Sequence, residues 1–146
     1  MNIIESLQSK NDKESYQLLL QLEMQASKSN VLYGYFDEFI ALLNHKKSLV
    51  RTRGFRLVCS QAQWDTENKL EKNLDILLCM LDDEKSTAVR QCLAALHTVI
   101  LYKPDLSEKI EVKLNTMDLS KYKDSMISLI KRDMEELRKH CCDSRL

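Results

Sequence analysis

The chain is poor in the residues that build turns and sheets. Only two glycines and one proline, Pro104, occur among 146 residues, and turns are made largely from Gly, Pro, Asn and Asp. The sequence also has no run of alternating β-branched residues, so a βαβ arrangement lacks its strands. This shortage favours long helices joined by short polar connections, and we expect an all-α fold.

An excess of one charge and long apolar runs are also missing. The 22 Lys and Arg residues balance 22 Asp and Glu residues. A dedicated nucleic-acid binder instead carries an excess of Lys and Arg, because these residues contact the phosphates. The start, residues 1–5, lacks the basic region and apolar stretch of a signal peptide. No apolar run approaches the roughly 20 residues of a membrane-spanning helix. We therefore expect a soluble cytoplasmic protein with no membrane partner.

Signatures of catalysis and of metal binding are lacking as well. The five cysteines are irregularly spaced without a C-x-x-C pair, which argues for reduced thiols. No G-x-S-x-G, Gly-rich phosphate loop or H-E-x-x-H motif occurs. The one cluster of metal-type ligands is His140-Cys141-Cys142. Adjacent residues on a helix point about 100° apart and cannot easily bind one ion together, so we interpret this cluster as part of a mobile tail. His97 lies on an apolar face and is interpreted as a core residue. The sequence predicts no enzyme, no cofactor and no metal site.

Helical periodicity runs through nearly the whole chain. Polar breaks and capping residues divide it into seven expected helices within one domain, residues 1–146. Asp65 or Thr66 is expected to begin the fourth helix, and Asp118 or Ser120 the last. The expected helices cover 12–28, 31–43, 49–62, 70–81, 87–102, about 106–116, and a final stretch to about Cys141, with 143–146 fraying.

An internal repeat links two of the predicted helix pairs. Val50 and Arg51 align with Val89 and Arg90, 39 residues later, close to the period of about 40 of HEAT and armadillo repeats. On a helical wheel each valine shares a face with apolar residues, and each arginine lies at the edge of that face. The repeat predicts two similar helical hairpins stacked side by side.

A valine followed by arginine in the first turn of a hairpin's second helix resembles the HEAT-repeat family. The resemblance implies a short right-handed α-solenoid of about three to four antiparallel hairpins. The best-matching repeats are residues 31–64 and 65–103. Residues 1–30 and 104–142 are expected to be atypical units that cap the stack.

The resemblance also implies that each arginine packs between repeats and pairs with an acidic residue in a turn. Asp82 or Asp83 would serve Arg90. The first unit has Asn44 at the matching place, which leaves the partner of Arg51 open. We assign structural roles to Val50, Arg51, Val89, Arg90 and Asp82.

The strongest local charge asymmetry lies in residues 39–64, which hold no Asp or Glu but several basic residues. On the wheel Lys46, Arg53 and Arg56 project to the side away from the apolar face. Second helices line the concave surface of HEAT-like stacks, where solenoids bind. We hypothesise that Lys46, Lys47, Arg53 and Arg56 bind an acidic segment of another protein. A charged face that only keeps the protein soluble is the alternative interpretation.

The sequence thus favours a non-enzymatic protein–protein interaction or scaffold module. One alternative is a nucleic-acid-binding protein, or a HEAT-like repair protein for alkylated bases, in which Tyr33 and Trp64 would stack on bases. The chain is shorter than such an enzyme needs, and its basic segment holds no carboxylate. A second alternative is a structural subunit that stacks its hairpin ends into homo-oligomers. The identity of the partner and the oligomeric state are left open.

Overall fold

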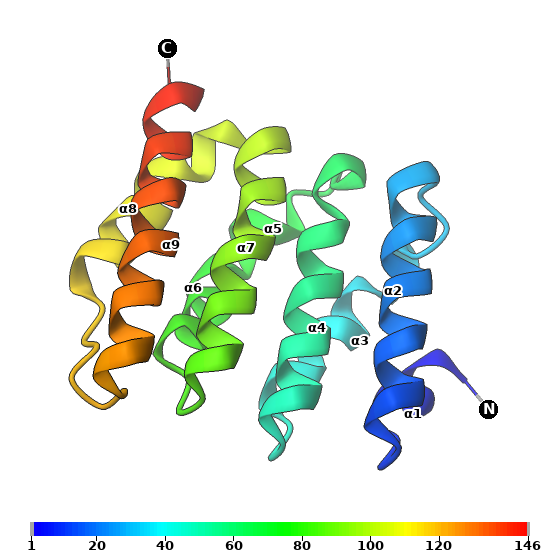
Figure 1. Cartoon of the computed structure of the whole chain (residues 1–146). Coiled ribbons are helices and arrows are strands. Elements are labelled where there is room, and N and C mark those ends of the chain that lie inside the picture. The colour runs from blue at the N-terminus through cyan, green and yellow to red at the C-terminus, as the bar shows by residue number, and fades with distance from the viewer. Residues whose placement is uncertain (1, 146) are drawn as a thin grey trace.

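Four long helices lie side by side and form one layer of the protein (Figure 1). The computed structural model describes residues 2–145, and every regular element in that range is helical. The all-α prediction is therefore confirmed. The four helices are α2 (Asp12–Lys28), α4 (Ser48–Ser60), α7 (Ser86–Tyr102) and α9 (Asp124–Ser144).

Shorter helices form a second layer behind the long ones, and the two termini lie at opposite ends of the row (Figure 1). Single 3-10 turns extend or connect these short segments. The short α-helices are α1 (Ile3–Leu7), α3 (Phe36–Ala41), α5 (Lys69–Lys72), α6 (Leu74–Leu78) and α8 (Ser107–Thr116). The 3-10 turns are η1 (Tyr33–Tyr35), η2 (Leu42–Asn44), η3 (Ala62–Trp64), η4 (Cys79–Asp82) and η5 (Pro104–Leu106).

The sequence predicted the long helices better than the short ones. α2 matches the expected range 12–28, and α7 begins one residue before the expected range 87–102. The expected helices 31–43 and 70–81 are each broken into short α-helical and 3-10 pieces. Helix α1 was not anticipated.

The last helix begins later than predicted, at Asp124 instead of at Asp118 or Ser120. The carboxylate of Asp118 accepts a hydrogen bond from the backbone N–H of Ser120 at 2.9 Å and turns the chain there. At the other end, the helix extends through Ser144, so the expected fraying of 143–146 is wrong for residues 143 and 144. Leu146 lies outside the described residues.

Side chains at the helix starts explain several of the boundaries. Asn11 precedes α2 and its side chain accepts from the backbone N–H of Glu14. The buried carboxylate of Asp65 accepts from the backbone N–H groups of Lys69 and Leu70, the first residues of α5. The residue that immediately precedes this helix is Asn68, not Asp65 or Thr66 as expected. Ser48 is the first helical residue of α4, and its hydroxyl donates to Asp83.

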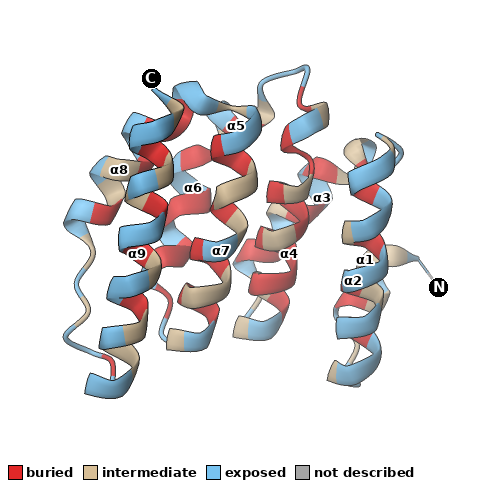
Figure 2. Cartoon of the chain, turned by 45° about the horizontal axis from the view of Figure 1, so that its top comes forward, coloured by how far each residue is buried: buried red, intermediate tan, exposed pale blue. Residues whose placement is uncertain are grey.

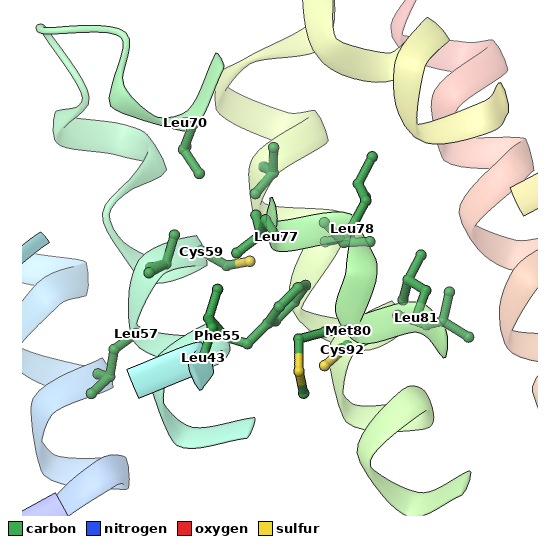
Figure 3. Close-up of a cluster of buried hydrophobic side chains, with 14 of the residues drawn as sticks. Leu43, Phe55, Leu57, Cys59, Leu70, Leu77, Leu78, Met80, Leu81 and Cys92 are labelled. Carbon is green, nitrogen blue, oxygen red and sulfur yellow. The ribbon is translucent and has the colours of Figure 1, made fainter. Parts of the chain in front are cut away.

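The hydrophobic core fills the space between the layers, where buried positions of the long helices face the short ones (Figure 2). Phe55 of α4, Leu77 of α6 and Cys92 of α7 lie in this core and are fully buried (Figure 3). Each such side chain contributes about 1.5–3 kcal/mol on burial. The five cysteines are free thiols. Cys59 and Cys92 are buried packing residues, and burial raises the pKa of both thiols.

One glycine sets how closely the two layers approach. A Cβ atom at Gly54 of α4 would lie 2.7 Å from the Cβ of Leu42 and 2.8 Å from the backbone oxygen of Phe39. Real Cβ atoms do not approach other heavy atoms so closely. Glycine therefore lets α4 pack directly on the segment that runs from α3 into η2.

Candidate functional site

Arg53 is part of the protein interior, and the prediction that it projects away from the apolar face to a binding surface was wrong. Its side chain is 4% exposed. It donates to the backbone oxygen of Leu7 at 2.9 Å and to the carboxylate of Asp12 at 2.9 Å. The helical wheel missed this because a second layer, α1, covers that side of α4.

Arg56 reaches the surface but is already paired within the chain. Its guanidinium makes a two-pronged contact with the carboxylate of Glu23 on α2, at 2.7 and 3.0 Å, and donates to the side-chain oxygen of Gln91 on α7. It also lies 5.7 Å from the ring centre of Tyr16. Burial alone would lower the pKa of Arg56. The hydrogen bonds to the Glu23 carboxylate and its negative charge have the larger effect and raise the pKa above its ordinary value. Arg56 thus bridges three long helices.

The two lysines of the predicted patch differ from each other. Lys47 donates to Asp12 at 2.8 Å, and both side chains are close to half exposed. Lys46 is exposed, and no side-chain hydrogen bond or ion pair holds it among the described residues. The basic stretch 39–64 is therefore largely neutralised by carboxylates that lie far away in the sequence.

Both arginines of the repeat motif pair with acids, and for Arg90 the partner differs from the expected one. Arg51 binds Asp83, at 2.7 and 3.1 Å, in the turn of the following hairpin. Arg90 binds Asp133 in α9 at 2.7 Å, so its expected pairing with Asp82 or Asp83 was wrong. Asp82 instead pairs with Lys113 of α8. Each arginine pairs with an acid of a later segment, and Arg51 also donates to the backbone oxygens of His45 and Lys46 in its own turn, at 3.0 and 2.9 Å.

Asp83 is the most highly connected of these acids. It accepts from the hydroxyl of Ser48 and from the backbone N–H of Lys85 as well as from Arg51. Burial alone would raise its pKa, but these three donors lower it below the ordinary range. Val50 and Val89, the motif valines, are fully buried.

A groove runs along the seam between α4 and α7. It consists of three adjoining hollows of about 280, 310 and 310 Å³. Gln91 lines the first two hollows and Arg56 lines the second and third, so neighbouring hollows share a side chain. The hydrogen bond from Arg56 to Gln91 crosses the seam between them. The lining residues come from α2, α4, α7 and their connections, and none comes from the short helices of the second layer.

Small side chains form the floor of the groove. Thr52 and Ala88 line one end, Ala94 and Ala95 the middle, and Thr98 the far part. Small residues leave room for the backbone or side chains of an incoming segment. Since α7 has 17 residues, the groove beside it is about 25 Å long, which is enough for several turns of a helix.

Large apolar side chains stand exposed around the groove. Leu101 and Tyr102 line its far end with 62% and 44% of their surface exposed. Leu49 lines the near end and is 45% exposed. On α2, Tyr16 contacts Arg56, and Leu20 lies one turn further along the same face. Exposed apolar residues that gather around a hollow are typical of an interaction site.

The sequence analysis predicted only some of the residues that line this groove. Of the four residues predicted to bind a partner, Arg56 and Lys47 line the groove, Arg53 is buried and Lys46 is not among the lining residues. The sequence analysis did not predict that residues of α7 line the groove, because small uncharged residues carry no distinctive sequence pattern. Their signal was available: Ala94, Thr98 and Leu101 recur at helical spacing on one side of α7.

The aromatic residues proposed for base stacking are held by other contacts. The indole N–H of Trp64 donates to the backbone oxygen of Ala26 at 2.6 Å. The hydroxyl of Tyr33 donates to Asp65 at 2.6 Å, and burial together with this carboxylate raises the pKa of Tyr33 to about 12. Both side chains therefore connect neighbouring units.

Residues 2–145 contain neither a membrane-spanning helix nor a cluster of metal-binding side chains. None of the helices formed by these residues combines the length and the apolar character needed to cross a bilayer. Within the same range, no three or more His, Cys, Asp or Glu side chains are arranged as a ready metal site. Comparisons with protein-family models, with curated protein sequences and with solved structures found no match to this chain.

Proposed function

We propose that this protein is a HEAT-like α-solenoid that binds another protein and has no catalytic activity of its own. Support comes from the two helical layers, from the Val-Arg repeat, and from polar links between successive units such as Arg51–Asp83 and Arg90–Asp133. In such an architecture each unit packs on its neighbours, and the stack offers an extended binding face. Its five free thiols suit the cytoplasm.

The observation that carries the proposal is the groove along α4 and α7. A floor of small residues, with Leu101, Tyr102 and Leu49 exposed at its ends, suits a helix or extended segment that buries apolar side chains. Glu23 already neutralises Arg56, so affinity would come mainly from apolar contact. Acidic residues of the partner would meet Lys47 and Lys85, which line the near end.

A groove-filling substitution tests this proposal. Ala94 is exposed and lies in the middle of the groove, so Ala94→Arg should block the groove without disturbing the core. Ala41 is an exposed alanine at the end of α3 in the other layer, and Ala41→Arg is the matched control. Peptides selected from a random 16-residue display library on the wild type serve as the probe.

We expect Ala94→Arg to weaken the binding of the selected peptides by at least about tenfold, the equivalent of 1.4 kcal/mol, while Ala41→Arg binds as the wild type does. Equal binding by the wild type and both variants would refute the groove as the binding face. A photo-crosslinking amino acid at position 98 then identifies the cellular occupant. A crosslink to a second copy of the chain would favour a homo-oligomer instead, and a crosslink to nucleic acid would refute the protein partner.

A further inference from the structure

Two histidines from different helices are hydrogen-bonded to each other at the seam between α7 and α9. The Nδ1 atoms of His97 and His140 lie 2.9 Å apart. The ring centres are 5.1 Å apart and the ring planes differ by 19°, so the rings meet edge to edge and each Nδ1 is directed at the other. The sequence analysis interpreted His97 as a core residue and His140 as part of a mobile tail, but both lie in regular helices and are partly exposed.

The strength of this contact depends on how many protons the two rings carry. A neutral imidazole has one N–H donor and one bare nitrogen, so two neutral rings satisfy each other when their tautomers are complementary. One added proton keeps a donor facing an acceptor, and its charge strengthens the bond. A second added proton sets two N–H donors and two positive charges against each other, and the bond is lost.

A second polar contact joins the same two helices. Arg90 binds Asp133 at 2.7 Å, and each of these residues lies seven positions before the corresponding histidine. Both pairs span 43 positions, so α7 and α9 run parallel in a constant register. Arginine and aspartate side chains ordinarily keep their charges between about pH 5 and 8, whereas histidine titrates in this range. Mild acid therefore acts on the histidine contact and spares the Arg90–Asp133 pair.

The charged groups that act on His97 belong to α9. Glu136 lies one turn before His140 on the same face and is exposed, and Asp133 is held by Arg90. On α7, the positions one turn before and after His97 are apolar. Burial and the neighbouring His140 lower the pKa of His97, and the pull of the two carboxylates offsets only part of this effect.

Two further helices pack against α7 and α9. α4 flanks α7 on the side away from α9 (Figure 1), and its Arg56 is paired with Glu23. α8 packs against α9, and its Glu111 is paired with Arg145. The charges of Arg56 and Glu111 are thus compensated outside the histidine contact.

These surroundings give the pH dependence its sign. The unfolded chain takes up a proton on His97 more readily than the folded protein, because burial and the second ring oppose the charge. The stabilisation by the histidine contact is therefore complete above the unfolded pKa of about 6.5 and is lost as the pH falls through the folded value. Both rings are partly exposed, so protons reach them without unfolding.

We propose that the His97–His140 pair is a proton-sensitive clasp, which holds α9 on α7 while the pair carries at most one added proton and releases α9 when both rings are charged. Because the Arg90–Asp133 pair persists, release begins at the C-terminal half of α9. It would uncover Leu137, which is fully buried while the clasp is closed. The clasp does not depend on the groove or on the proposed function.

Amide hydrogen exchange of the full chain at about pH 7.5 and about pH 5 tests the clasp. Rates are expressed as protection factors, so that the intrinsic pH dependence of exchange cancels. We expect the amides of residues 134–141 to lose protection by at least about tenfold at the lower pH, while those of α4 keep theirs. Unchanged protection in residues 134–141 overturns the clasp, and an equal loss in α4 overturns its local character.

A matched pair of variants separates the clasp from a general effect of acid. His140→Asn keeps a polar side chain but cannot carry the second charge, so we expect its loss of protection in acid to fall below about twofold. His45, whose Nδ1 accepts from the backbone N–H of Lys47 in another part of the chain, provides the control, and His45→Asn should keep the loss seen in the wild type. A tenfold loss that persists in His140→Asn overturns the proposal.

NMR titration of the imidazole signals measures the coupling directly. In the wild type we expect the pair to titrate in two coupled steps. In His140→Asn, His97 should titrate in one step, at a higher pH than the second step of the pair. A His97 titration that is the same with and without His140 overturns the coupling. If His140→Asn fails to fold, the reciprocal variant His97→Asn carries the same expectations for His140.

Discussion

The two central helices, α4 and α7, share the Val-Arg motif, yet they hold their neighbours by different means. α4 carries three arginines, and each is tied to a neighbouring unit: Arg51 to Asp83, Arg53 to Asp12, and Arg56 to Glu23. α7 has one such link, from Arg90 to α9. Its other polar contacts to neighbouring long helices join Gln91 to Arg56 and His97 to His140. Much of its remaining exposed surface is apolar or small, and part of it lines the groove.

This difference shows that a segment rich in Lys and Arg does not have to form a basic surface in the folded protein. The acids that neutralise α4 lie 32 to 41 residues away along the chain. Such distant residues come side by side because α4 packs against both α2 and α7. The helix with few charges is the one that keeps exposed apolar side chains, such as Leu101 and Tyr102.

The largest test of this comparison is Arg53→Ala. The substitution leaves the backbone oxygen of Leu7 without its donor and removes packing against α1. We expect the free energy of unfolding to fall by about 2–4 kcal/mol, measured by urea denaturation. Gln91→Ala, at a partly exposed position of α7 that accepts from Arg56, should cost less than about 1 kcal/mol. Equal losses would mean that α4 is no more tightly bound by polar contacts than α7.

The close approach at Gly54 gives the next largest effect. Gly54→Ala places a methyl group 2.8 Å from a backbone oxygen that cannot move freely. Although alanine favours helices over glycine, we expect a net loss of about 1–3 kcal/mol from overpacking. The control is Cys92→Ala in α7, where a side chain already fits. A stabilised Gly54→Ala variant would show that the two layers can separate at no cost.

Asp83, in the turn before α7, binds Arg51 of α4, and this link should make the free energy of unfolding depend on pH. Its pKa in the folded protein is lowered, so its contribution is complete above the unfolded value of about 3.9 and is lost as pH falls through the folded value. We expect Asp83→Asn to cost about 1–2 kcal/mol at pH 7. The difference from the wild type should shrink below about pH 4. A difference that stays constant down to pH 2 would contradict the assignment.

The smallest expected effect is at Lys46, which precedes α4 and whose side chain makes no hydrogen bond or ion pair with the residues the structure describes. Lys46→Glu should change the unfolding free energy by less than about 0.5 kcal/mol. Lys85→Glu, at the matching entrance to α7, is also exposed and should behave alike in stability measurements. A larger loss at Lys46 alone would indicate an intramolecular partner.

The sequence predicted the helical class and the long helices α2 and α7, because their apolar stripes recur with a clear helical period. It also singled out Arg51 and Arg90, which pair with acids of other segments, but it assigned Arg53 and Arg56 to a binding surface. It could not assign their partners, since pairing depends on the direction in which successive units stack. Arg53 shows the limit most clearly: a helical wheel describes one helix, and the second layer that buries Arg53 is invisible to it. The groove lies beyond prediction for the same reason, because it belongs to two helices 38 residues apart.

The polar links between units have a consequence for how the chain folds. No side-chain hydrogen bond between the described residues spans more than 46 positions, so folding never requires the two ends of the chain to find each other. Low contact order favours rapid folding. Protection of backbone amides from hydrogen exchange should then be graded, highest in α4 and α7 and lowest in the outermost α2 and α9, which each have a neighbouring long helix on one side only. A cell would meet partly opened molecules whose middle is still intact, with the groove preserved while the ends open and close.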